Sequence, residues 1–167
     1  MILRLACLAV LASTLSCTGT NRNPCGLSTS LPDVPSGTLR VTRDGNPYVV
    51  DSGLRGYRLI NDRTDIEAGE LTLAIGKDDQ GRNVRELVDQ GTFPICILLN
   101  DQSDGTTYAQ VRATGVSFGT DSSHTGTVAL LAKEGDVLVG RFELEAVENG
   151  GSGTTTLEDG VFRLGPR

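Results

Sequence analysis

Tryptophan is absent from this chain of 167 residues, which also holds only one histidine, three tyrosines and four phenylalanines. Sugar-binding proteins commonly stack sugar rings on aromatic side chains, so this scarcity disfavours a carbohydrate-binding role. A zinc site needs several His or Cys ligands, which a single histidine and two cysteines expected to form a disulfide do not supply. We therefore expect no metal site of that kind, and no motif indicates a cofactor.

Basic side chains are also in short supply. The chain has 15 Lys and Arg residues against 21 Asp and Glu residues, a formal net charge of −6 at pH 7. A surface of this sign repels nucleic acid and anionic lipid headgroups. No run of basic residues and no interleaving of basic and aromatic residues offsets it, so we expect no nucleic-acid partner.

The first sixteen residues differ from the rest because they are almost entirely apolar. Arg4 is the only charge among them, and an apolar run of eleven residues, Leu5–Leu15, follows it. This arrangement is typical of a secretory signal peptide, and it is shorter than the roughly twenty residues of a membrane-spanning helix. We expect export and removal of residues 1–16; a buried N-terminal helix or strand is the alternative.

The end of this segment carries a second signal. Thr14, Leu15, Ser16 and Cys17 resemble the lipobox of bacterial lipoproteins, in which a lipid is attached to the cysteine and the preceding peptide is removed. The resemblance implies a membrane anchor at Cys17, although an ordinary signal peptidase would also accept Thr14 and Ser16. In many Gram-negative bacteria an Asp after the lipidated cysteine retains the protein in the inner membrane. Thr18 therefore favours the outer membrane, facing the periplasm or the cell surface.

The cysteine count agrees with lipidation. Export leaves Cys17, Cys25 and Cys96, an odd number, in an oxidising compartment where unpaired thiols are rare. A lipid on Cys17 leaves Cys25 and Cys96 to form one disulfide. That bridge closes a loop of about seventy residues and contributes on the order of 4 kcal/mol in the chain-entropy model. Two unpaired buried thiols are the alternative.

Residues 17–37 are dominated by Ser, Thr, Asn, Pro and Gly, which predicts an irregular lead-in after the anchor cysteine. From residue 38 to 167 the apolar residues recur with a period of two, as in strands of a single domain. The clearest signal is TVALLAKEGDVLVGRFELEA, a hairpin around Glu134-Gly135-Asp136. Its second strand places on one face Leu138, Gly140, Phe142, Leu144 and Ala146, and on the other, solvent-exposed face Arg141, Glu143 and Glu145.

One segment favours a helix of one or two turns. Asn83 is suited to cap it, Glu86 follows three residues later, and Gly91 is suited to end it. The pattern as a whole predicts an all-β fold, an antiparallel sandwich or partly closed barrel of about nine short strands with at most one short helix.

The closing region is similar to the end of many uncharacterised small bacterial lipoproteins. In them an apolar-Gly-x-Phe-x-apolar strand is followed by a polar loop and a last strand opened by Asp-Gly-x-Phe. The matching residues here are Val139, Gly140, Phe142 and Leu144, then Asp159, Gly160 and Phe162. The resemblance implies an exported β-domain and transfers no catalytic residue.

Three groups of residues are of a type found in catalytic or metal sites. Asp121, two serines and His124 lie together in one loop, but a hydrolytic triad is assembled from separated elements, so we expect a polar loop. The acidic loops Asp78–Gly81 and Asn100–Gly105 suit calcium, yet Asp and Gly are also what ordinary turns require. Glu143 and Glu145 share one strand face, which we interpret as a wet surface.

The leading hypothesis is therefore a lipid-anchored β-domain of the cell envelope, a non-catalytic binding or structural module. Its partners would be the membrane, through the lipid, and an envelope protein or small ligand. The alternative is a barrel-type carrier of a small apolar ligand, which requires a hollow interior. A secreted hydrolase is the third hypothesis.

Overall fold

Alternating apolar and polar side chains build most of this chain into antiparallel strands. The computed structural model describes residues 25–100, 107–113 and 115–167, which contain eleven strands and one helix. The elements are β1 (Thr38–Arg43), β2 (Asn46–Val50), β3 (Arg55–Ile60), β4 (Arg63–Ala68), β5 (Leu71–Ile75), α1 (Val84–Asp89), β6 (Ile95–Leu99), β7 (Thr107–Ala113), β8 (Val116–Gly119), β9 (Gly126–Glu134), β10 (Val137–Glu148) and β11 (Thr154–Leu164). The expected all-β fold class is confirmed.

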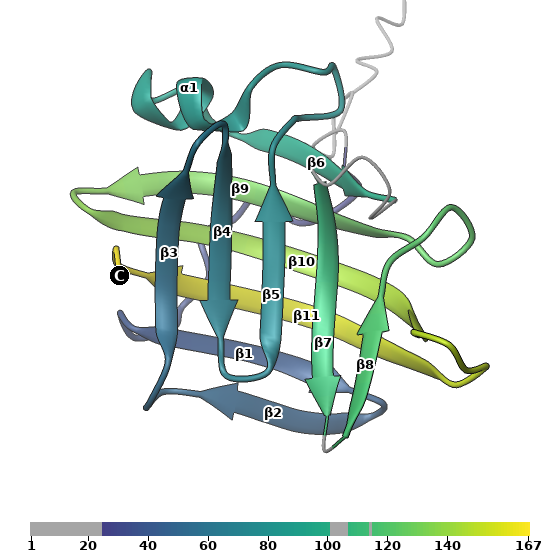
Figure 1. Cartoon of the computed structure of the whole chain (residues 1–167). Helices are drawn as coiled ribbons and strands as arrows, with labels where there is room; N and C mark the ends of the chain where they lie inside the picture. The colour runs from purple at the N-terminus through teal and green to yellow at the C-terminus, as the bar shows by residue number, and fades with distance from the viewer. Residues whose placement is uncertain (1–24, 101–106, 114) are drawn as a thin grey trace, which may run out of the picture.

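The strands form two layers that cross each other (Figure 1). The first layer holds β3, β4, β5, β7 and β8, and the second holds β6, β9, β10, β11, β1 and β2. The layers are continuous because Val147 and Glu148, at the end of β10, pair with β8. Nine strands thus follow one path, β2-β1-β11-β10-β8-β7-β5-β4-β3, and β9 and β6 extend the second layer from β10.

The other side of the barrel is bridged by the end of the chain. Tyr57 of β3 donates its N–H to the carbonyl of Gly165 at 3.0 Å, and its carbonyl accepts the N–H of Arg167 at 3.0 Å. The side chain of Arg167 forms an ion pair with Glu67 of β4. These contacts tie the tail after β11 to the edge strand β3, so the path of strands is nearly closed into a barrel.

The interior is packed with side chains from both layers. Gly140 lies opposite Phe162, and Gly160 lies opposite Phe142, in the pairing of β10 with β11. A Cβ on Gly140 would lie 2.4 Å from the Phe162 ring, and one on Gly160 would lie 2.6 Å from the Phe142 ring. The two Gly-x-Phe patterns of the sequence therefore interlock, each ring filling the space over the opposite glycine. The ring centroids are 6.3 Å apart.

The strand β4 could not be identified from the pattern of apolar residues. β4 reads RTDIEA, with polar side chains at its start, and its outward-facing Asp65 is nonetheless only 3% exposed. The Nε atom of Arg63 lies 2.8 Å from Oδ1 of Asp65, and the guanidinium lies 5.7 Å from the ring centroid of Tyr108. The buried carboxylate is thus paired with a side chain two residues away, which itself contacts a ring from β7, and a periodicity argument does not detect such contacts.

The helix expected near Asn83 is present as α1. The side chain of Asn83 accepts the N–H of Glu86 at 3.2 Å, which caps the first turn. The apolar face of α1 buries Val84, Leu87 and Val88 against the core at one end of the barrel. Among the described residues, no helix has the length and apolarity needed to cross a membrane.

Candidate functional site

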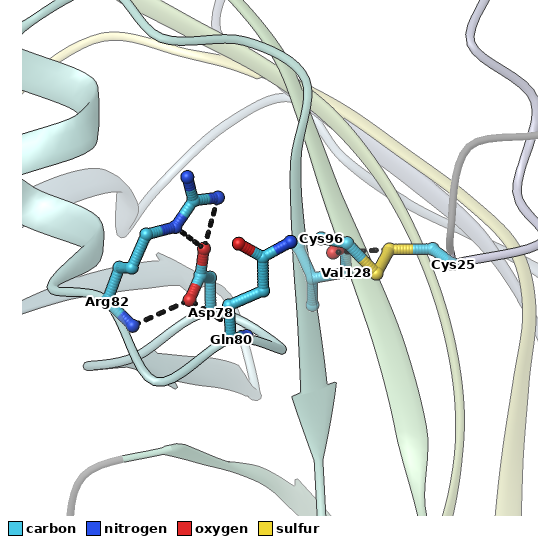
Figure 2. Close-up of a disulfide and its surroundings, with 6 residues drawn as sticks. All are labelled: Cys25, Asp78, Gln80, Arg82, Cys96 and Val128. Atoms are coloured by element: carbon cyan, nitrogen blue, oxygen red, sulfur yellow. Dashed lines mark hydrogen bonds and ion pairs between the residues drawn. A yellow bond between two sulfur atoms is a disulfide. The ribbon is translucent and has the colours of Figure 1, made fainter.

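The structure brings together the two cysteines expected to pair. Cys25 and Cys96 are joined with an S–S distance of 1.98 Å and a Cα–Cα distance of 5.5 Å (Figure 2). Cys96 lies on β6 and points outward, away from the core between the layers. It belongs to a separate apolar cluster with Ala129 and Leu131, against which Leu27 packs. The predicted lipid site at Cys17 lies outside the described residues.

Residues 25–37, called the strap below, cross the outer face of the second layer. After the disulfide, the strap carbonyl of Ser30 accepts Nε–H of Arg141 at 3.1 Å, and the carbonyl of Asp33 accepts from Arg40 at 3.2 Å. The strap therefore follows one row of paired, outward-facing residues across six strands. That row is Cys96, Ala129, Arg141, Val161, Arg40 and Val49.

Beyond the strap, the outer face of the same layer is acidic and wet. Glu143 and Glu145 are exposed, as expected from their alternation with buried residues in β10. They line a shallow groove with Glu158 of β11. These carboxylates lie on an open sheet face that does not enclose them. This agrees with the interpretation of Glu143 and Glu145 as part of a solvated surface.

The acidic loop Asp78–Gly81 is closed by an internal ion pair. Oδ1 of Asp78 accepts the N–H groups of Gln80 at 3.0 Å and of Arg82 at 2.7 Å, and Oδ2 accepts Nε–H of Arg82 at 2.6 Å (Figure 2). Burial alone would raise the pKa of Asp78, but the hydrogen bonds from Arg82 and Gln80 outweigh it and lower that pKa. Both carboxylate oxygens are committed to the loop itself.

No group of three or more potential ligands that could hold a metal ion occurs in the described part of the chain. The second acidic loop considered for calcium, Asn100–Gly105, lies outside the described residues except for Asn100.

The single histidine is part of a loop turn. Oδ1 of Asp121 accepts the N–H groups of Ser123 at 2.8 Å and His124 at 2.6 Å, and Nδ1 of His124 lies 3.0 Å away from the same oxygen. Hydrogen bonds from the His124 and Ser123 backbone, with the imidazole, lower the pKa of Asp121. The carboxylate and the imidazole thus organise one turn, as expected for a polar loop.

A cleft that no sequence pattern indicates lies at the end of the barrel beside α1. It has a volume of about 490 Å³, against about 310 Å³ for the groove between the strap and β2. One wall is the turn between β3 and β4, and the other is the segment after β5. Its lining residues are Ile60, Asn61, Asp62, Arg63, Gly76, Lys77, Gly81 and Asn83. The two walls come from separate segments of the sequence, so no single local motif predicts the cleft.

No family model matches this chain, and no curated protein or solved structure matches it either.

Proposed function

We propose that this chain is a lipid-anchored β-domain of the cell envelope and acts as a non-catalytic binding or structural module. The observation that carries the proposal is the pairing of Cys25 with Cys96. With these two sulfurs bonded to each other, Cys17 is the one cysteine of residues 17–167 left to carry a lipid. The lipobox resemblance at Thr14–Cys17 supplies the same assignment independently.

The anchor would hold the domain close to the membrane. Cys25 lies eight positions after Cys17, and an extended chain of that length reaches less than about 30 Å. The strap then fixes the entry of the chain onto β6, β9 and β10 through the disulfide and Arg141. Thr18 supports an outer-membrane location, as argued above.

The packed interior supports a module that binds at its surface over a carrier of apolar ligands. Phe142, Phe162 and Leu130 are each at most 1% exposed and occupy the space between the two layers. A carrier needs that space for its ligand. The hydrolase hypothesis loses support because Asp121 and His124 are joined within a single turn. A screen of the purified chain with ester and peptide substrates tests that hypothesis directly.

The anchor is tested by replacing the lipid-accepting cysteine. We expect the wild-type chain in the membrane fraction, released by detergent and not by high salt. Cys17→Ala should abolish this membrane association, because it removes the only proposed site of attachment. Cys7→Ala is the matched control, since Cys7 lies in the removed segment and should leave fractionation unchanged. A Cys17→Ala chain that fractionates with membranes to the same extent as wild type would refute the anchor.

A further inference from the structure

We propose that the cleft beside α1 binds a small zwitterionic ligand, a free amino acid or short peptide with both a carboxylate and an ammonium group. The inference rests on the proposed function in one respect, that the domain is a binding module. The cleft volume of about 490 Å³ lies within the range of small-molecule sites, about 300–1,000 Å³.

The first wall presents a lysine from a rigid loop. Lys77 and Asn83 form an isolated antiparallel bridge, and directly opposed residues in such a bridge have neighbouring side chains on the same side. The loop between them is held by the buried carboxylate of Asp78, whose side chain is fully buried and bonded to Arg82. Asn83 uses its side-chain oxygen to cap α1, so its amide NH₂ group is available as a donor.

The second wall is also fixed by internal contacts. Nη1 of Arg85 on α1 donates to the carbonyl of Asn61 at 2.6 Å, which ties the β3–β4 turn to the helix. Asn61 has a positive φ of 50°, a conformation that Asn tolerates in tight turns. Arg63 is held by Asp65 and lies over the ring of Tyr108. The turn is therefore positioned before any ligand arrives.

The class of ligand is inferred from which charged side chains near the cleft already have an ion-pair partner within the domain. Arg63 and Arg82 form ion pairs within the domain, with Asp65 and Asp78. Within the described residues, neither Lys77 nor Asp62 has an ion pair or a side-chain hydrogen bond, and both line the cleft. One uncommitted cation and one uncommitted anion, flanked by amide groups, match a ligand that carries both charges. A carboxylate would bind Lys77 and an ammonium group would bind Asp62.

The experiment uses the full chain in detergent, labelled with ¹⁵N-lysine. Lys77 and Lys133 are the only two lysines, so the spectrum holds one lysine amide signal at the cleft and one on β9 as an internal control. The probes are glycine, triglycine, N-acetyl-triglycine and triglycinamide. We expect the Lys77 signal to move with glycine or triglycine while Lys133 stays still. Each blocked peptide should bind about tenfold or more weakly than triglycine, since one charged hydrogen bond is lost.

Variants separate the two ends of the ligand. The variants are followed in uniformly ¹⁵N-labelled chains through the backbone amide of Asn83, which lines the cleft, because Lys77→Gln removes the lysine probe. Lys77→Gln should bind triglycine no better than it binds triglycinamide, and Asp62→Asn should bind triglycine no better than it binds N-acetyl-triglycine. Lys133→Gln and Asp51→Asn, exposed or partly exposed sites outside the cleft, should behave as wild type. The proposal is overturned if neither glycine nor triglycine moves Lys77 at about 10 mM, enough to saturate a millimolar site. It is also overturned if the blocked peptides bind equally well. Neither result affects the anchor, which fractionation tests separately.

Discussion

Glycine and phenylalanine side by side account for much of the packing between β10 and β11. Gly140 is flanked by the Phe162 ring and by the carbonyl of Ala129, so even a methyl group has no room. The polar–apolar alternation of β10 could be predicted, and so could its wet face at Glu143. The contact of Gly140 and Gly160 with rings of the opposite strand could not be predicted, because neither strand's sequence alone determines the register of β10 against β11.

Gly140→Ala should therefore destabilise the domain. The new Cβ would lie 2.4 Å from Phe162 and 2.7 Å from the Ala129 carbonyl, and overpacking of this kind costs about 1–3 kcal/mol. Urea unfolding at equilibrium measures the loss in the free energy of unfolding. Gly165→Ala is the control, because a Cβ at Gly165 meets nothing within 4 Å. Equal stability of the two variants would contradict the account of the core.

Asp78 provides a second residue-scale prediction. Asp78→Asn removes the ion pair with Arg82 in a fully buried position and should lower the free energy of unfolding by about 1–3 kcal/mol at pH 7. The neighbouring exposed residue gives the control, Asp79→Asn, which should have little effect. Unfolding curves of the three chains measure both. A stable Asp78→Asn chain would mean that the loop does not depend on its carboxylate.

The difference in stability between wild type and Asp78→Asn should depend on pH in a defined direction. The pKa of Asp78 in the folded chain lies below its ordinary value of 3.8, so the carboxylate contributes stability that is present above that value. This contribution is lost as the pH falls through the lower, folded pKa. The stability gap between wild type and Asp78→Asn should thus be constant near neutrality and shrink below about pH 4. A gap that grows on acidification would contradict the direction of the shift.

Among the elements, the strap and α1 were predictable, while β4 and the cleft were not. The helix could be predicted from nearby residues, namely the cap at Asn83, Glu86 three residues later and an apolar face. The odd number of cysteines likewise indicated the bridge that fastens the strap. The sequence of β4 does not indicate a half-buried strand, since its Asp65 is a charged residue that is buried beside Arg63, which in turn lies over the Tyr108 ring. The cleft joins the β3–β4 turn to the segment after β5, so its existence follows from tertiary packing alone.

The disulfide should stabilise the strap more than any other element. In a Cys17→Ala background, which removes the third thiol, Cys25→Ala with Cys96→Ala should lower the free energy of unfolding by about 4 kcal/mol. Hydrogen exchange should rise in β9 beneath the strap, where Ala129 and Leu131 lose their cover. The background chain with its bridge intact is the reference. Unchanged stability and exchange would show that the strap is held without the bridge.

For the whole molecule, the strap and the last residues are both fastened to the strands of the barrel. The chain enters at the disulfide on β6, crosses the second layer as the strap, and ends beside β3 through Tyr57 and Arg167. The order of strands around this barrel could not be predicted, because it pairs β1 with β11 and β5 with β7 across long stretches of sequence. The expected export, lipid anchor and outer-membrane location, by contrast, were argued mainly from the consecutive residues 1–18.

The most direct measurement of the central proposal is the intact mass of the chain isolated from membranes, with thiol alkylation before and after reduction. The account predicts a chain that begins at Cys17 and carries the added mass of lipid, with two sites alkylated only after reduction. A lipid-free chain in which Cys17 is alkylated without reduction, or is bonded to Cys25 or Cys96, would contradict it.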